Sequence, residues 1–226
     1  MSTLYIVATP IGNLEDITFR AVRILNEVDI ILCEDTRTTK KLLEAHAISY
    51  KKLVSYHAHS QDARHQEILT WLKEGMNIAL VSDAGTPTIS DPGVKLVQLI
   101  YTELPDVTIS PIPGASALMS ALSMSGISSA QFVFYGFLPH KKGRAKIFQD
   151  MADQEHTCVC YESPHRLMKT LEAFTTYLPP EKTVVVVREI TKIYEQAVRG
   201  SAQEVYTHFQ NHPDTVRGEC VIVVGV

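Results

Sequence analysis

The chain has 226 residues, of which 45% are hydrophobic and 20% charged, and its formal net charge is -4 at pH 7. This length suits one large α/β domain or two small ones, and the weakly acidic balance argues against a protein that attracts nucleic acid through its overall charge. No apolar run approaches the ~20 residues that cross a bilayer, and a strand-like run beginning near Met1 leaves no room for a secretory signal. We therefore expect a cytoplasmic protein without a membrane segment.

The first half of the sequence alternates short apolar runs with segments whose apolar residues recur at helical spacing. Several of the apolar runs are continuous, which is typical of strands that are buried on both faces in a parallel sheet covered by helices. In chain order, we predict strands at residues 4–8, 29–33, 53–56, 77–81 and 107–110, and helices at residues 17–27, 62–73 and 92–101.

The second half repeats this pattern, with Val184-Val185-Val186-Val187 as its longest valine run. We predict strands at residues 132–135, 157–161, 183–188 and 220–224, and helices at residues 164–177 and 202–211. The stretch Ser110–Ser116 divides the strands into two roughly equal sets. We therefore expect two α/β/α domains with mostly parallel sheets, residues 1–112 and 113–226, and a ligand in the cleft between them.

Three loops rich in small residues leave the ends of predicted strands in the first half. They are Thr9–Asn13, Ser82–Gly93 and Pro111–Ser116. Open α/β sheets bind ligands at the carboxyl ends of their strands, so these loops predict one shared ligand pocket. The sequence holds neither a G-x-G-x-x-G turn nor a G-x-x-x-x-G-K-[ST] loop, which argues against a nicotinamide-dependent Rossmann enzyme and against a P-loop nucleoside triphosphatase.

Acidic residues follow two predicted strands of the first half, those at residues 29–33 and 77–81. Asp83, at a strand tip, can accept hydrogen bonds from ribose hydroxyls or an amino group, whereas Asp91 before Pro92 is placed to cap a helix. The run Glu34–Lys40 carries four charged side chains, which indicates either a substrate site or a helix N-terminus capped by Asp35 or Thr36.

The second half places polar residues after its own strands, in Tyr161–Arg166 and Val187–Lys192. A basic stretch, His140–Lys146, follows Tyr135-Gly136-Phe137-Leu138-Pro139 and suits contact with phosphates. The candidate phosphate contacts are Lys141, Lys142, Arg144 and Lys146.

Cysteine and histidine spacing gives no metal site. Cys158 and Cys160 lie two residues apart, which is not zinc spacing, and with Cys33 and Cys220 we expect them to be reduced core residues. His57 and His59 lack a third ligand. A hydrolase is also disfavoured, because no G-x-S-x-G elbow accompanies Ser163.

Taken together, the motifs and their order resemble one family, the ribosomal RNA small subunit methyltransferase I family of the tetrapyrrole methylase superfamily. The motifs are Leu4–Leu14, Glu34–Arg37, Ser82–Pro87, Gly136–Pro139 and Tyr161–Arg166. The resemblance implies S-adenosylmethionine as methyl donor, the ribose 2′-hydroxyl of a cytidine in the decoding region of small-subunit (16S) rRNA as acceptor, and a homodimer. Members usually continue past the last strand into a short helical segment, so some rRNA contacts are expected outside this sequence, which stops at Val226.

The resemblance also implies site residues. Those expected to bind the donor are Pro10, Ile11, Gly12, Asp83, Thr86, Ser116, Ala117 and Tyr161. Since a ribose hydroxyl is poorly acidic, methyl transfer gains from a base and from a cation near the developing alkoxide. We expect a carboxylate or Lys192 to accept the proton, and Arg37 or Arg166 to hold a phosphate. The candidate catalytic residues are Glu34, Asp35, Arg37, Glu162, Arg166, Glu189 and Lys192.

Two alternatives stay open. A tetrapyrrole-type methyltransferase that acts on a small molecule would need a broad acceptor cleft and no basic strip. A non-catalytic RNA-binding or nucleotide-binding module would bind without forming a methylated product.

Overall fold

A computed structural model describes residues 2–57 and 62–225 of the chain. The chain divides into two compact units, Met1–Ser116 and Ala117–Val226. The sequence places the boundary after residue 112, whereas the structure divides the chain after Ser116. The expected cleft between the halves stays a prediction.

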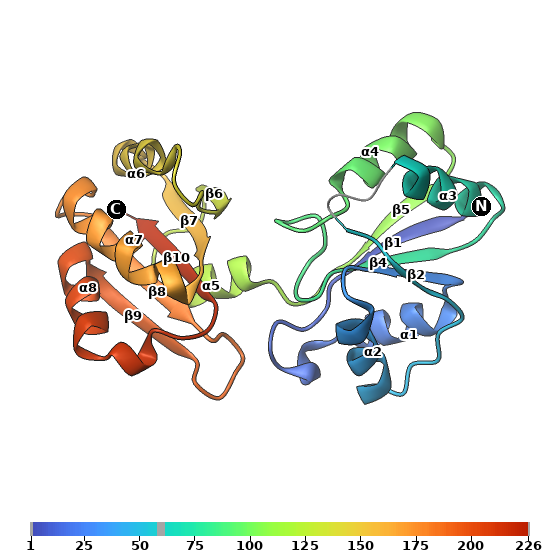
Figure 1. Ribbon diagram of the computed structural model, residues 1–226, viewed down its shortest axis with the longest axis horizontal. Helices are drawn as coiled ribbons and strands as arrows, with labels where there is room; N and C mark the ends of the chain where they lie inside the picture. Colours follow the sequence, from blue (N-terminus) through green and yellow to red (C-terminus); the bar gives the residue numbers. More distant parts are fainter. Residues whose placement is uncertain (1, 58–61, 226) are drawn as a thin grey trace. The chain divides into compact units, whose positions relative to one another are not determined.

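The first unit is a five-stranded parallel sheet in the order β3-β2-β4-β1-β5. Its elements are β1 (Thr3–Val7), η1 (Leu14–Asp16), α1 (Phe19–Glu27), β2 (Ile30–Cys33), α2 (Thr36–Ala45), β3 (Leu53–Ser55), α3 (Asp62–Lys73), β4 (Ile78–Val81), α4 (Val94–Glu103) and β5 (Thr108–Ile112). Helices α1 and α2 cover one face, and α3 and α4 cover the other (Figure 1). The predicted parallel sheet is confirmed for this unit.

Helix starts in this unit follow the capping chemistry of the sequence. The Asp35 side chain accepts a hydrogen bond from the backbone N–H of Arg37, 2.8 Å away, and so caps α2 as one interpretation expected. The cap expected from Asp91 is wrong, because α4 begins at Val94 with Gly93 at its N-cap. Gly93 has φ 134°, and a Cβ there would meet the Leu80 side chain at 2.7 Å, so the loop turns into the helix at the one residue without a side chain.

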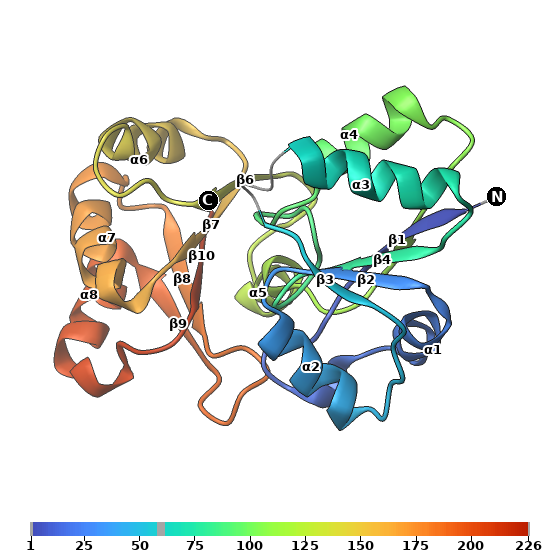
Figure 2. The same ribbon diagram turned by 45° about the vertical axis from the view of Figure 1, so that its right-hand side comes forward.

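The second unit holds five strands in the order β6-β7-β10-β8-β9 (Figure 2). Its elements are α5 (Ala117–Ser125), β6 (Phe132–Phe137), α6 (Arg144–Asp153), β7 (Thr157–Glu162), α7 (Pro164–Tyr177), β8 (Thr183–Arg188), β9 (Gln196–Ser201), α8 (Ala202–Asn211), η2 (Pro213–Thr215) and β10 (Cys220–Gly225). The expectation of a mostly parallel sheet is wrong here. β6 and β7 pair in parallel, whereas β10 runs antiparallel to β7 and β8, and β8 antiparallel to β9.

The valine run of β8 explains this difference. Val184, Val185, Val186 and Val187 are all at most 1% exposed, and the helices that pack on β8 include α8 and α5. A continuous apolar run therefore reports burial on both faces and not strand direction. β9 was not predicted, because this edge strand alternates half-buried and exposed positions and carries Arg199.

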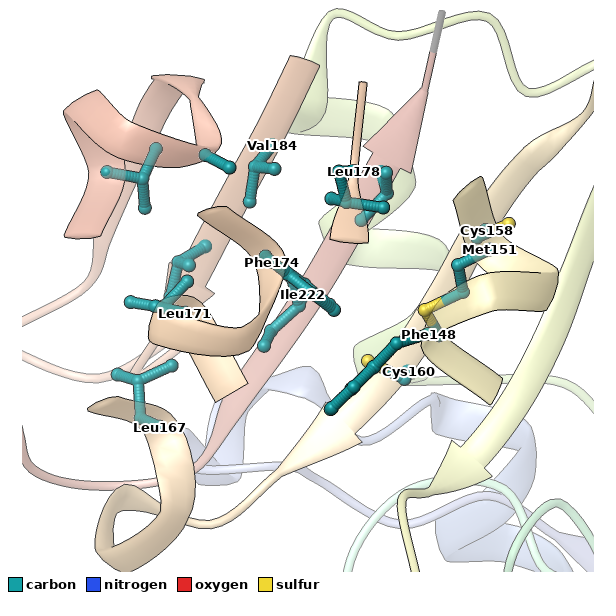
Figure 3. Packing of buried hydrophobic residues seen from close by; sticks show 14 of the residues in the cluster. Phe148, Met151, Cys158, Cys160, Leu167, Leu171, Phe174, Leu178, Val184 and Ile222 are labelled. Carbon is teal, nitrogen blue, oxygen red and sulfur yellow. The ribbon is translucent and has the colours of Figure 1, made fainter. Parts of the chain in front are cut away.

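The core of the second unit lies between its sheet and helices α6, α7 and α8. Phe148 of α6 packs edge-to-face on Phe174 of α7, with ring centroids 5.4 Å apart, and Figure 3 shows both beside Ile222 of β10. Cys33, Cys158, Cys160 and Cys220 are buried and free, as expected. None of the helices in the described ranges, 2–57 and 62–225, is long and apolar enough to span a bilayer.

Candidate functional site

Three loops meet at the carboxyl edge of the first sheet, as the sequence predicts. Thr9 and Gly85 exchange two backbone hydrogen bonds of 2.9 Å, which join the loop after β1 to the loop after β4. The loop after β5 is attached on both sides, because Ala8 N donates to Ile112 O (3.2 Å) and the Thr86 hydroxyl donates to Ala115 O (3.2 Å). The three loops therefore form one connected surface.

Close backbone approach in these loops depends on small residues. A Cβ on Gly114 would lie 3.0 Å from the Ala8 Cβ, and one on Gly85, at φ 82°, would lie 3.4 Å from a methyl group of Ile11. The loop after β4 also holds Thr88 and Ser90 at φ 73° and 68°. Non-glycine residues in this conformation are strained and concentrate at functional sites.

Buried Thr9 is a site residue that the sequence interpretation missed. It is 2% exposed, and its hydroxyl donates to the carbonyl of Ser82 at 3.1 Å, so it fixes the loop after β4 at the tip of the strand. A threonine at the end of an apolar strand was the available signal, because a buried hydroxyl needs a partner.

The residues expected to bind the donor fall into two groups. Six of them, from Pro10 to Ser116, lie in the three loops of the first unit: Pro10 and Ile11 are buried, Thr86 and Ser116 are half-buried, and Gly12 and Asp83 are exposed. Ala117 begins α5, and Tyr161 lies in β7 of the second unit.

Acidic side chains gather at the same edge because β2 lies next to β4. The backbone N–H of Asp35 donates to Asp83 Oδ1 at 3.0 Å. Burial, followed by the charge of Asp83, raises the pKa of Glu34. Burial, followed by the charges of Glu34 and Asp83, raises the pKa of Asp91 to about 6. Asp91 thus belongs to a carboxylate cluster and not to a helix cap.

Asp35 and Arg37 form an exposed pair at the start of α2. Arg37 Nη2 and Nε donate to the two Asp35 oxygens at 2.7 and 3.1 Å, and the Arg37 side chain is 86% exposed. The side-chain hydrogen bond from Arg37 is the first cause that lowers the pKa of Asp35 to about 2. Asp35 is therefore a weak proton acceptor, and Arg37 is accessible to an anion.

Glu162 is the centre of a buried ion-pair network in the second unit. Its side chain is 0% exposed and lies 2.8 Å from both Arg144 Nη2 and Arg166 Nη2. Thr170 donates to the Oε2 atom at 2.7 Å, and the backbone N–H of Ser163 donates to Oε1 at 2.9 Å. Both carboxylate oxygens are thus occupied by donors from two helices, α6 and α7, and from Ser163, the residue between β7 and α7.

This network changes the roles expected for two arginines. Arg144, expected to contact RNA, has a side chain only 14% exposed, while Arg166, expected to hold phosphate, has one only 16% exposed. Both donate to Glu162 and to loop carbonyls, those of Pro139 and Leu138 respectively. The sequence does not predict that these arginines pair with Glu162, because a run of charged residues does not show which of them the fold buries. The remaining basic residues, Lys141, Lys142 and Lys146, are exposed.

The turn between β8 and β9 holds the other two expected catalytic residues. Lys192 Nζ lies 3.0 Å from Glu189 Oε1, and Glu189 and Thr191 have φ 51° and 66°. Buried Arg188 supports the turn, since its Nη1 donates to the carbonyl of Tyr194 at 3.0 Å. The half-buried Lys192 therefore sits in a strained, well-anchored turn.

Metal ligation has no support in residues 2–57 and 62–225, which contain no group of three or more His, Cys, Asp or Glu placed to hold an ion. His57 Nε2 lies 2.6 Å from the Ser55 hydroxyl. His59 lies outside the described residues.

Solved structures confirm the predicted fold class. A cobalt precorrin-4 methyltransferase of cobalamin biosynthesis matches with a TM-score of 0.69 and 18% identity, covering 99% of this chain and 94% of that chain. Uroporphyrin-III C-methyltransferase from Thermus thermophilus, solved with S-adenyl homocysteine, matches with a TM-score of 0.64 and 18% identity, covering 99% and 97%.

Sequence relatives are much more similar. Relatives from Synechocystis sp. and Bacillus subtilis are each 47% identical over 227 residues, covering 100% of this chain and 80% and 76% of their own lengths. A relative from Thermotoga maritima is 43% identical over 224 residues and is covered over 98% of its length. All three are named ribosomal RNA small subunit methyltransferase I, and residues 3–206 match the family Tetrapyrrole (Corrin/Porphyrin) Methylases. The chain therefore belongs to the tetrapyrrole methylases and, among them, to the ribosomal RNA small subunit methyltransferase I family.

Proposed function

We propose that this protein transfers a methyl group from S-adenosylmethionine to the ribose 2′-hydroxyl of a cytidine in the decoding region of small-subunit (16S) rRNA. The observation that carries the proposal is the 43–47% identity to three relatives named for small-subunit rRNA methylation. The loops and carboxylates at the edge of the first sheet support it with a suitable donor site.

The residues of this edge fit the methyl donor. The chain leaves β1 toward β2 and leaves β4 toward β5, in opposite directions along the sheet, so β1 and β4 flank a switch point where open sheets bind ligands. S-adenosylmethionine carries a sulfonium and an ammonium group. Burial, followed by repulsion from Glu34 and Asp83, raises the pKa of Asp91 to about 6, and a cationic ligand relieves the part that is due to repulsion.

Particular residues would hold the donor. We propose that the exposed Asp83 carboxylate accepts hydrogen bonds from its ribose or amino group, and that the loop backbone at Pro10, Ile11, Gly12 and Thr86 lines the rest. Ser116, Ala117 and Tyr161 stay in the proposal on the family resemblance. When bound, the donor supplies an electrophilic methyl group.

The chain's own residues must then position the ribose and accept its proton, since an in-line transfer depends chiefly on orientation. We propose Glu34 as the proton acceptor, because its raised pKa brings it closer to neutral pH than that of Asp35. Lys192 is the alternative acceptor, in a step that first requires the loss of its own proton to solvent, and Arg37 contacts a phosphate of the substrate. Glu189 positions Lys192 through their 3.0 Å ion pair.

Glu162 and Arg166 have positioning roles in this proposal, because their charged atoms are committed to the buried network. We also propose that the protein acts in the cytoplasm, and that it forms a homodimer, which the family resemblance implies.

The test is to incubate the chain with methyl-labelled donor and undermethylated small ribosomal subunits, then map the labelled nucleotide. Label on one cytidine ribose supports the proposal. Label on a small tetrapyrrole in place of rRNA supports the alternative, a tetrapyrrole methyltransferase, which is the activity named for the two solved structures of similar fold. Donor binding without product in either assay identifies a non-catalytic module.

Replacing Glu34 with Gln and, separately, Lys192 with Met then identifies the proton acceptor. Loss of the acid limb of the pH–rate profile in Glu34→Gln, with that limb retained in Lys192→Met, supports Glu34. The reverse pattern assigns the proton to Lys192.

A further inference from the structure

Phe137 is a large apolar side chain that the second unit leaves open to solvent. It ends β6, an edge strand of its sheet, and is 58% exposed. Its ring lies edge-on to Tyr161, with centroids 5.3 Å apart, and Tyr161 in turn lies edge-on to Phe134 at 5.0 Å. We call Phe134, Phe137 and Tyr161 the aromatic platform.

The backbone around Phe137 has a defined conformation, set by a bulge before the residue and a buried residue after it. Gly136 has φ 60°, and the register between β6 and β7 shifts between Phe134 and Phe137, so a bulge sets the direction of the ring. Leu138, the next residue, is 2% exposed and anchors the chain in the core.

The buried ion pairs hold the same segment from the other side. Arg166 Nη1 donates to the carbonyl of Leu138 at 2.7 Å, and Arg144 Nη1 donates to the carbonyl of Pro139 at 3.1 Å. Both arginines are themselves anchored on Glu162. The ring is thus presented by a rigid support, which lowers the entropy lost when a ligand packs against it.

Charge next to the platform identifies the kind of ligand. Residues 137–146 contain four Lys or Arg and no Asp or Glu, although the whole chain has a net charge of -4. Arg144 is used internally, which leaves Lys141, Lys142 and Lys146 exposed. An exposed aromatic ring followed closely along the chain by exposed cations is a combination that suits single-stranded nucleic acid, through base stacking and phosphate contact.

We infer that Phe137 stacks against an unpaired base of the RNA substrate while Lys141, Lys142 and Lys146 contact its phosphates. This inference rests on the proposed function and adds a specificity-determining residue to it. The buried Glu162 network then has a purpose beyond stability, since it holds the stacking ring in place.

The test measures the affinity of the full chain for a short fluorescein-labelled single-stranded RNA. Phe137→Ala is expected to weaken binding roughly 5- to 140-fold, the range for loss of one base–aromatic stack. Phe137→Trp keeps a stacking face and is expected to restore most of the affinity. The matched control is Tyr101→Ala. Tyr101 is 69% exposed on α4, and the chain that follows α4 enters β5 at the amino edge of the first sheet, the edge opposite the three loops.

Salt dependence separates stacking from charge. Phe137→Ala is expected to leave the slope of log affinity against log salt unchanged, whereas Lys141→Met is expected to reduce it by about one phosphate contact. The affinity for S-adenosylhomocysteine and the melting temperature of Phe137→Ala are expected to stay at wild-type values.

Several results overturn the inference. One is wild-type RNA affinity in Phe137→Ala, and another is no RNA binding by the wild-type chain. A third is a loss confined to S-adenosylhomocysteine binding, which would assign the ring to the donor site, or a loss confined to melting temperature, which would assign it to packing. The proposed function is judged separately. If the wild-type chain methylates small subunits and Phe137→Ala does so with unchanged KM, only the inference fails; if the wild-type chain does not methylate them, the proposed function fails even where Phe137 stacks on RNA.

Discussion

Replacing Glu162 with Gln distinguishes a catalytic carboxylate from a structural one. The change keeps the size of the side chain but leaves two arginines facing a neutral amide at 2.8 Å. Removing one partner of a buried ion pair costs about 3–5 kcal/mol. We expect the lower end, about 3 kcal/mol, because Arg144 and Arg166 keep their backbone carbonyl acceptors and are 14% and 16% exposed.

The assay is thermal unfolding followed by circular dichroism, with methyl transfer measured well below the transition. For a protein of this size each kcal/mol shifts the melting temperature by ~2–4 °C, so Glu162→Gln is expected to melt roughly 6–12 °C lower. The control is Glu155→Gln, an exposed carboxylate of the same unit, which is expected to stay within about 0.5 kcal/mol of wild type. A Glu162→Gln protein that melts like wild type but no longer transfers methyl groups would refute the structural role and return Glu162 to the chemistry.

Further predictions concern the edge of the first sheet and the turn after β8. Asp91→Asn is expected to raise the free energy of unfolding at pH 8 by about 1 kcal/mol, a value reduced because the group is half-buried, and urea titration measures it. The sign follows from the raised pKa: the native acid binds its proton more tightly than the unfolded one, so wild-type stability falls as pH rises from about 4 toward 6, and that slope should disappear in Asp91→Asn. Donor affinity, by contrast, is expected to rise through pH 6 as Asp91 ionises, and calorimetry that finds a flat profile would contradict the electrostatic fit. Thr9→Val is expected to cost about 1–3 kcal/mol, since the buried carbonyl of Ser82 loses its donor, with unfolding by guanidinium as the measurement. Gly218→Ala places a Cβ into the Glu189 carboxylate at φ 74°, so it should lower kcat for methyl transfer through Lys192, and unchanged kinetics would mean that this turn is not part of the site.

Much of the architecture follows from patterns that report burial. The helices Asp62–Lys73, Pro164–Tyr177 and Ala202–Asn211 lie at the predicted bounds, because apolar spacing and flanking residues such as Pro164 and Gly75 define both ends. The antiparallel pairs of the second sheet could not be predicted, since a strand buried on both faces looks the same in either direction.

The candidate site shows a similar division. Loops that leave neighbouring parallel strands must meet at one edge, so the contact between Thr9 and Gly85 could be anticipated from sequence. The uses of Glu162, Arg144 and Asp91 could not, because they depend on which charges the fold buries together. Thr170, which interrupts the apolar face of α7, was the one local signal of a buried acceptor.

The most direct test of the donor site is calorimetric titration of S-adenosylmethionine into the wild-type chain, Asp83→Asn and the exposed control Asp106→Asn. Loss of a hydrogen bond to a charged group predicts roughly 10- to 100-fold weaker binding by Asp83→Asn. Asp106→Asn should bind like wild type. Equal affinity in all three proteins, or no binding by the wild-type chain, would contradict the placement of the donor on the carboxyl edge of the first sheet.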